Sequence, residues 1–173
     1  MIVLNLKSVG GCVFRRAKLN IFVLDTNIKC CAQYHVDKHI VKMVLETTQL
    51  LNNSIFINNK QAILPYKITH LNHPATQWAS TNKANFRWLN QLGLALCQEY
   101  TYRYNRRHKC QDILEYFSAS EFKIPEGELT PFIQCMPDQY RQADPVLAYR
   151  EYYRKEKRDF AKWTKRPNPE WWF

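Results

Sequence analysis

The sequence has few glycines, few acidic residues and no long apolar segment. Only 4 of its 173 residues are glycine and 14% are aromatic, which excludes disorder along most of the chain. No run of about 18 apolar residues occurs, which excludes a membrane-spanning helix. Neither a Cys-x-x-Cys nor a His-Glu-x-x-His pattern occurs, so neither zinc-binding spacing is available. We therefore interpret the six cysteines as reduced thiols of an intracellular protein.

Basic residues outnumber acidic ones. The chain has 25 Lys and Arg against 15 Asp and Glu, a net charge of +10, which favours nucleic acid as the partner before a membrane surface. Residues 1–18 carry basic residues and no acidic residue. We interpret them as a basic N-terminal extension that could be disordered. Residues 19–173 are then predicted to form a single domain, as their length suggests.

Helical patterns account for most of residues 19–173. Residues 21–24 are predicted to be a short strand or an extended arm. Pro74 and the pair Asp144-Pro145 are typical helix starts. Helices are expected over 29–53, 75–105, 109–118 and 145–163, with irregular chain over 120–143. The sequence therefore predicts a mostly α protein, a single compact helical domain with long central helices and irregular loops.

The first of these helices carries a stripe of chemically varied side chains. Spacings of four and three residues place His35, His39, Lys42 and Glu46 on one helical face. The stripe is either a solvated face or a site. A metal is disfavoured because Lys42 would repel a cation, so we predict no metal and no cofactor. Acid–base or amine chemistry is the alternative, because a lysine near a glutamate can act as a nucleophile. The predicted catalytic residues are Glu46, Lys42, His39 and His35.

Two segments rich in basic and aromatic residues, 103–109 and 150–166, suit contact with phosphates and stacking on bases. Either could instead be a solvated cationic surface, and Glu99 with Arg103 could form a simple ion pair at a helix end. We predict that the two segments flank one nucleic-acid strand and that salt weakens binding. The predicted nucleic-acid-binding residues are Lys38, His73, Arg103, Arg106, Arg107, Arg154, Lys157, Arg158, Trp171 and Trp172.

The stretch Asp37-Lys38-His39-Ile40 followed by Glu46 resembles a helix of the pyrimidine-dimer DNA glycosylases of the phage endonuclease V type. His73 before a long helix, and Arg166-Pro167 before two tryptophans, are also similar to that family. The resemblance implies that Glu46 is catalytic and assists a Schiff base at C1′ of the damaged nucleotide. It also implies a glycosylase and abasic-site lyase acting on damaged double-stranded DNA.

The sequence departs from this family at two places. The family's nucleophile is the amine of a small N-terminal residue, whereas here 18 residues precede the matching start and Asn20 is its second residue. The family also has arginines beside the glutamate, where this chain has Leu45 and Gln49. The expected nucleophile is therefore Lys42 or an N-terminal amine.

Two other functions stay open. The run from Phe22 to Asn27 looks like the first strand of PIN-type nucleases, which would make Asp25 a ligand of a divalent cation. Alternatively, the protein could bind RNA or a free nucleotide without catalysis. No membrane partner is expected, and the expected location is intracellular.

Overall fold

The computed structural model describes residues 19–173, so the predicted basic extension, residues 1–18, lies outside the described part. Within 19–173 the secondary structure is entirely helical, with no strand. The α-helices are α1 (Ile28–Tyr34), α2 (Asp37–Asn58), α3 (Pro74–Thr81), α4 (Lys83–Tyr104), α5 (Gln111–Ala119) and α6 (Pro145–Glu156). Short 3-10 turns span Asp138–Tyr140, Arg158–Phe160 and Glu170–Trp172. The predicted mostly α fold is confirmed.

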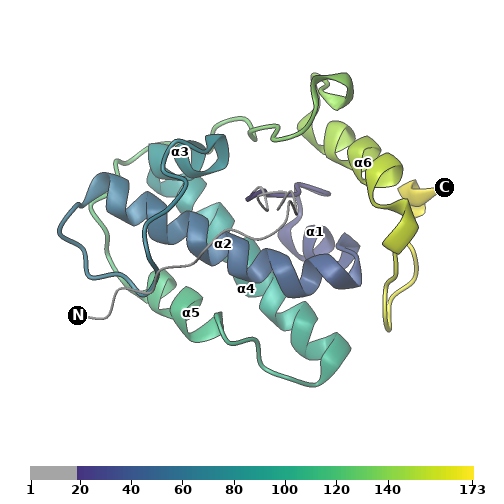
Figure 1. Ribbon diagram of the computed structural model, residues 1–173, viewed down its shortest axis with the longest axis horizontal. Coiled ribbons are helices and arrows are strands. Elements are labelled where there is room, and N and C mark those ends of the chain that lie inside the picture. Colours follow the sequence, from purple (N-terminus) through teal and green to yellow (C-terminus); the bar gives the residue numbers. More distant parts are fainter. Residues whose placement is uncertain (1–18) are drawn as a thin grey trace, which may run out of the picture.

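The two longest helices, α2 and α4, form the centre of the molecule. They pack against each other, with α3 and α5 alongside, while α1 packs on α4 (Figure 1). Gly93 of α4 marks a close approach, because a Cβ added there would lie 2.9 Å from the Thr47 side chain of α2. The buried apolar residues from Leu19 to Trp163 form one cluster. The division into an extension and a domain stays a prediction.

Residues 19–24, which we call the arm, are extended and buried rather than paired in a sheet. The arm joins α6 to the central helices. The ring of Phe22 packs against His39 of α2 and against Tyr149 and Tyr153 of α6. The Arg150 Nε donates to the carbonyl of Leu24. The arm is therefore buried in the core as a strand would be, but it pairs with no strand in the described residues.

The helix predicted over 29–53 is two helices with a break at His35 and Val36. Both residues are extended, with ψ of 134° and 156°. The amide of Val36 donates to the Tyr153 hydroxyl, and the carbonyl of His35 accepts from Arg103. These distant partners replace the helical hydrogen bonds that a continuous helix would need.

The helices predicted over 75–105 and 145–163 also differ from expectation. Asn82 divides the former, because its side chain caps α4 by accepting from the Asn85 amide. The last helix ends at Glu156, so Trp163 is not part of it. The starts at Pro74 and Pro145 are confirmed, with Asp144 capping α6. In the described residues, no helix has the length and apolar character needed to cross a bilayer.

Candidate active site

A pocket of about 1030 Å³ opens between α2, the arm, the start of α3 and one side of α6. Five predicted site residues line it: His39, Lys42, Glu46, His73 and Lys157. The remaining lining residues are Leu19, Asn20, Phe22, Pro74, Cys135, Met136, Pro137, Arg141 and Tyr152. The fold therefore gathers residues that are far apart in the sequence around one opening.

Glu46 is the buried carboxylate of this pocket, with 4% of its surface exposed. Its Oε1 lies 2.7 Å from Nζ of Lys42, one helical turn earlier on α2. Its Oε2 accepts a hydrogen bond of 3.1 Å from the backbone N–H of Asn20 in the arm. Each carboxylate oxygen thus faces a nitrogen from a different element. The half-exposed Lys42 side chain reaches from this pair toward solvent.

His39 is buried on the pocket wall. Its ring stacks on Phe22 with 4.7 Å between ring centroids, and Nδ1 lies 2.6 Å from the Tyr153 hydroxyl. Burial, with the charges of His35, Lys157 and Lys42 adding to it, lowers the pKa of His39 to about 2. Because the Tyr153 hydroxyl accepts from Val36, it can donate its own proton to Nδ1 of His39. A neutral ring with its proton on Nε2 follows from that arrangement.

His35 does not join the stripe. It is the C-cap of α1, it is fully buried, and it is not part of the pocket lining. Its Nδ1 lies 2.8 Å from the Cys31 carbonyl, which requires the hydrogen on Nδ1. The expected catalytic position of His35 is therefore wrong, because the chain breaks between α1 and α2 and turns its ring into the core.

Acidification from about pH 7 to pH 5 is expected to lower the free energy of unfolding. Burial holds the pKa of His35 at about 4 and that of His39 at about 2, against an ordinary value of 6.5. The unfolded chain therefore binds more protons below pH 6.5, and stability falls as the pH falls toward the folded values. Each histidine should cost about 2 kcal/mol over this interval. Guanidinium unfolding at the two pH values measures the loss.

The His35→Gln variant provides the control for this pH effect, because glutamine keeps a hydrogen-bond donor and cannot titrate. It should show about half of the pH dependence of the wild type. An undiminished dependence in His35→Gln would contradict the assignment of the effect to buried neutral imidazoles.

A family model described as pyrimidine dimer DNA glycosylase matches residues 19–112, more than half of the chain. The chain belongs to this family. The matched residues include the arm, α1 to α4, and the pocket residues Glu46 and His73, and the match ends before α6. The resemblance inferred from the motifs is thereby confirmed, and it implies DNA as the substrate of the protein. No curated protein and no solved structure matches the chain.

Arg103 is buried and holds parts of the protein together. Only 2% of its surface is exposed, and its guanidinium donates to Glu99 at 2.7 Å and to Asp37 at 2.9 Å. It also donates to the carbonyls of Gln33 and His35. The predicted contact between Arg103 and a phosphate is therefore wrong, because the side chain is buried and each of its three guanidinium nitrogens already donates to an acceptor inside the protein.

The carboxylate of Glu99 is also fully engaged in hydrogen bonds with arginines of the protein. It accepts two further hydrogen bonds, of 3.0 and 2.9 Å, from Arg166. Burial by itself raises the pKa of Glu99, but the hydrogen bonds from Arg166 and Arg103 outweigh it and hold that pKa below its usual value. The ion-pair interpretation of Glu99 and Arg103 is confirmed, although the pair is buried rather than exposed.

The other predicted DNA-binding residues fall into separate groups. Arg154, Arg158 and Trp172 share a surface pocket of about 340 Å³ with Glu151, Lys155 and Phe173. Lys38 lies 4.7 Å above the ring of Phe160. Trp171 packs against Tyr34 and Tyr153. Of the two segments expected to flank one strand, only 150–166 reaches the pocket that contains Glu46, through Tyr152 and Lys157. The joint placement of the two segments stays a prediction.

The remaining predicted basic residues, Arg106 and Arg107, lie just after the end of α4. Arg107 is half-exposed and pairs with Asp112 and with Glu115, and Arg106 is exposed. None of residues 103–109 lines the pocket that contains Glu46. Arg106 and Arg107 are therefore available only to DNA that extends beyond that pocket.

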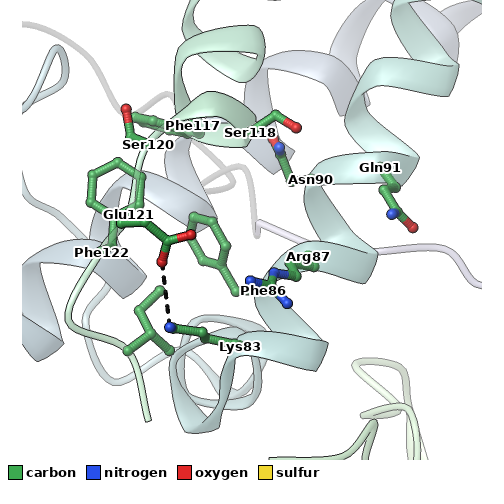
Figure 2. A pocket seen from close by; sticks show the side chains of 11 residues that line it. Lys83, Phe86, Arg87, Asn90, Gln91, Phe117, Ser118, Ser120, Glu121 and Phe122 are labelled. Carbon is green, nitrogen blue, oxygen red and sulfur yellow. Dashed lines mark hydrogen bonds and ion pairs between the residues drawn. The ribbon is translucent and has the colours of Figure 1, made fainter. Parts of the chain in front are cut away.

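Figure 2 shows a smaller pocket of about 260 Å³ between the first half of α4 and the end of α5. Lys83 there lies 3.4 Å from Glu121, whose side chain is 80% exposed. None of the predicted site residues lines this pocket. Its carboxylate is solvated, unlike the buried carboxylate of Glu46.

The nuclease interpretation of Asp25 is wrong. The arm before it is not a strand, and the Asp25 carboxylate is paired with Arg150 at 2.8 Å. Across residues 19–173, no group of three or more His, Cys, Asp or Glu side chains is arranged to hold a metal ion. A PIN-type site needs several acids from adjacent strands, and residues 19–173 contain no strand.

Sequence reasoning missed Tyr152 and Tyr153 near the site, and it did not predict the contact between Asn20 and Glu46. Asn20 enters only because the arm crosses α2 at Glu46, which is 26 residues later. Tyr153 is buried in the core, but its hydroxyl also orients His39. No local sequence signal distinguishes a core tyrosine whose hydroxyl contacts a site from one that only packs.

Proposed function

We propose that the protein releases damaged bases from double-stranded DNA and cleaves the resulting abasic site through a Schiff base, with Glu46 assisting. The observation that carries this proposal is the Glu46 carboxylate. It is buried in the large pocket, between Nζ of Lys42 and the backbone nitrogen of Asn20. Family membership supports damaged DNA as the substrate. An intracellular location belongs to the same proposal, because the substrate is cellular DNA.

The pocket supports this chemistry in its size and charge. Enzymes that act on a base extrude the nucleotide from the duplex into a pocket, and about 1030 Å³ is ample for one nucleotide. Lys42 and Arg141 line the pocket with positive charge that suits the phosphates beside an extruded nucleotide. His73 caps the N-terminus of α3, where a phosphate is also favoured.

Glu46 would act in two ways. A carboxylate beside the sugar stabilises positive charge that develops at C1′ as the base leaves. The same carboxylate can accept and return the protons that a Schiff base requires. The nitrogens at Lys42 and Asn20 mark the two positions of the amine that the sequence suggests, and both lie against Glu46.

Sodium borohydride trapping tests the proposal. Wild-type protein is incubated with UV-irradiated duplex DNA and with a duplex that contains one abasic site, and the reductant is then added. A covalent protein–DNA complex on both substrates, and strand cleavage at the abasic site without the reductant, are the expected results. An undamaged duplex is the matched control and should give no complex. Tight binding of the damaged duplexes without a complex or cleavage would contradict the proposal and favour a non-catalytic binding protein.

A further inference from the structure

The two nitrogens against Glu46 are poorly suited to attack. Lys42 is bound to Glu46 as an ion pair at 2.7 Å, and an ammonium ion has no lone pair. In this chain the nitrogen of Asn20 is a peptide amide that donates to Glu46, and its lone pair is delocalised into the carbonyl. A Schiff base needs a neutral amine. The pocket contains one further lysine amine, that of Lys157.

Lys157 follows the last turn of α6, and its side chain lines the pocket beside Phe22 and Tyr152. Its Nζ lies 4.7 Å from the ring centroid of Tyr152 and 6.0 Å from that of Phe22. The Tyr152 hydroxyl is 3.5 Å away. Among residues 19–173 it forms no ion pair. The amine therefore lies beside two aromatic rings and a phenolic hydroxyl, and no carboxylate of the described residues pairs with it.

The charged groups around Lys157 come from three elements. Lys42 and His39 face it from α2, together with Glu46 beyond Lys42, and Arg141 lines the same pocket from the loop before α6. Glu156 is its sequence neighbour, but that carboxylate accepts the hydroxyl of Tyr140. Burial lowers the pKa of Lys157, Glu156 opposes this, and Lys42 adds to it. Desolvation and a neighbouring cation are the two means by which proteins make a lysine nucleophilic.

We infer that Lys157 is the amine that forms the Schiff base with C1′ of the abasic deoxyribose, while Lys42, paired with Glu46, serves as a proton donor. This inference rests on the proposed function and names the nucleophile of that same site. It assigns Lys157 a catalytic role in place of the phosphate contact expected from the sequence. The assignment depends on two observations: the rings of Phe22 and Tyr152 lie beside the Lys157 amine, and Lys157 forms no ion pair among residues 19–173.

The step balances with groups of this pocket. The lone pair of the neutral Lys157 nitrogen forms a bond to C1′ of the ring-opened sugar, and the carbonyl electrons move to oxygen. That oxygen takes one proton from the attacking nitrogen and a second from the Lys42 ammonium, and it leaves as water. The product is a protonated imine between Lys157 and C1′. Glu46 then stabilises this positive charge and accepts protons in later steps.

Borohydride trapping on an abasic duplex, followed by peptide mass mapping, tests the inference. In the wild type the reduced adduct should map to Lys157. Lys157→Arg keeps the positive charge but offers no neutral amine at accessible pH, and it should lower trapping by at least about 100-fold. Its affinity for a duplex with a reduced, non-reactive abasic analogue should stay within a few-fold of the wild type. Lys155→Arg, an exposed neighbour on α6, is the matched control and should trap like the wild type.

A second measurement does not depend on any variant. Brief labelling of the wild-type protein with an amine-reactive acylating reagent near pH 7 should modify Lys157 faster than the exposed Lys155. An adduct on Lys42 or on an N-terminal amine, or wild-type trapping by Lys157→Arg, would overturn the inference and leave the Schiff-base proposal standing. No adduct in the wild type on any damaged duplex would overturn both.

Discussion

Replacing Glu46 with glutamine is expected to lower the rate of base release from UV-irradiated duplex DNA by about 100- to 10,000-fold. Glutamine has nearly the same shape, and its amide oxygen can still accept from the backbone N–H of Asn20. It has no negative charge, so it neither stabilises the positive charge at C1′ nor accepts a proton. The measurement is single-turnover base release, because it separates chemistry from product release.

Binding and stability should change little in Glu46→Gln. The lost partner of Glu46 is Lys42, whose side chain is half-exposed, and ion pairs of that kind contribute about 1 kcal/mol or less. The matched control is Glu121→Gln, which removes the exposed carboxylate of the smaller pocket shown in Figure 2 and should leave base release unchanged. Base release by Glu46→Gln within threefold of the wild type would show that this carboxylate is not part of the chemistry.

The part of the site on α2 could be predicted from the sequence because it depends on helical periodicity alone. His39, Lys42 and Glu46 are spaced by three and four residues inside one helix, so they face the same pocket. The starts of α3 and α6 were predictable for a similar reason, since Pro74 and Asp144-Pro145 act within their own first turn.

The position of His35 could not be predicted, because partners far along the chain determine it. The break after α1 is fixed by the hydroxyl of Tyr153, 117 residues beyond Val36, and by Arg103, 68 residues beyond His35. The helical spacing of His35, His39 and Lys42 in the sequence continues across this break, so the sequence pattern does not reveal it. The surroundings of Lys157 could not be predicted for the same reason: its sequence context shows a basic helix face, and only the fold adds Phe22 beside it.

The buried position of Arg103 leads to the second large effect, on stability. Arg103→Met is expected to lower the free energy of unfolding by about 3–5 kcal/mol. Methionine fills much of the same space but leaves the carbonyls of Gln33 and His35 without their donor and removes a cation from Glu99 and Asp37. A lost buried ion pair is costly because the remaining charges cannot regain water. Guanidinium unfolding measures the change directly.

Arg107→Met is a matched control, because Arg107 lies four residues after Arg103 and just beyond the end of α4. Arg107 also contacts two carboxylates, Asp112 and Glu115, but its side chain is 52% exposed. Its replacement should cost about 1 kcal/mol or less, because water compensates exposed charges. The Arg103→Met loss corresponds to a fall of about 10 °C in Tm for a protein of this size. Equal losses in the two variants would contradict the argument from burial. A larger loss in Arg103→Met would show that this arginine holds the junction of α1 and α2, and thereby the start of the helix that carries His39 and Glu46.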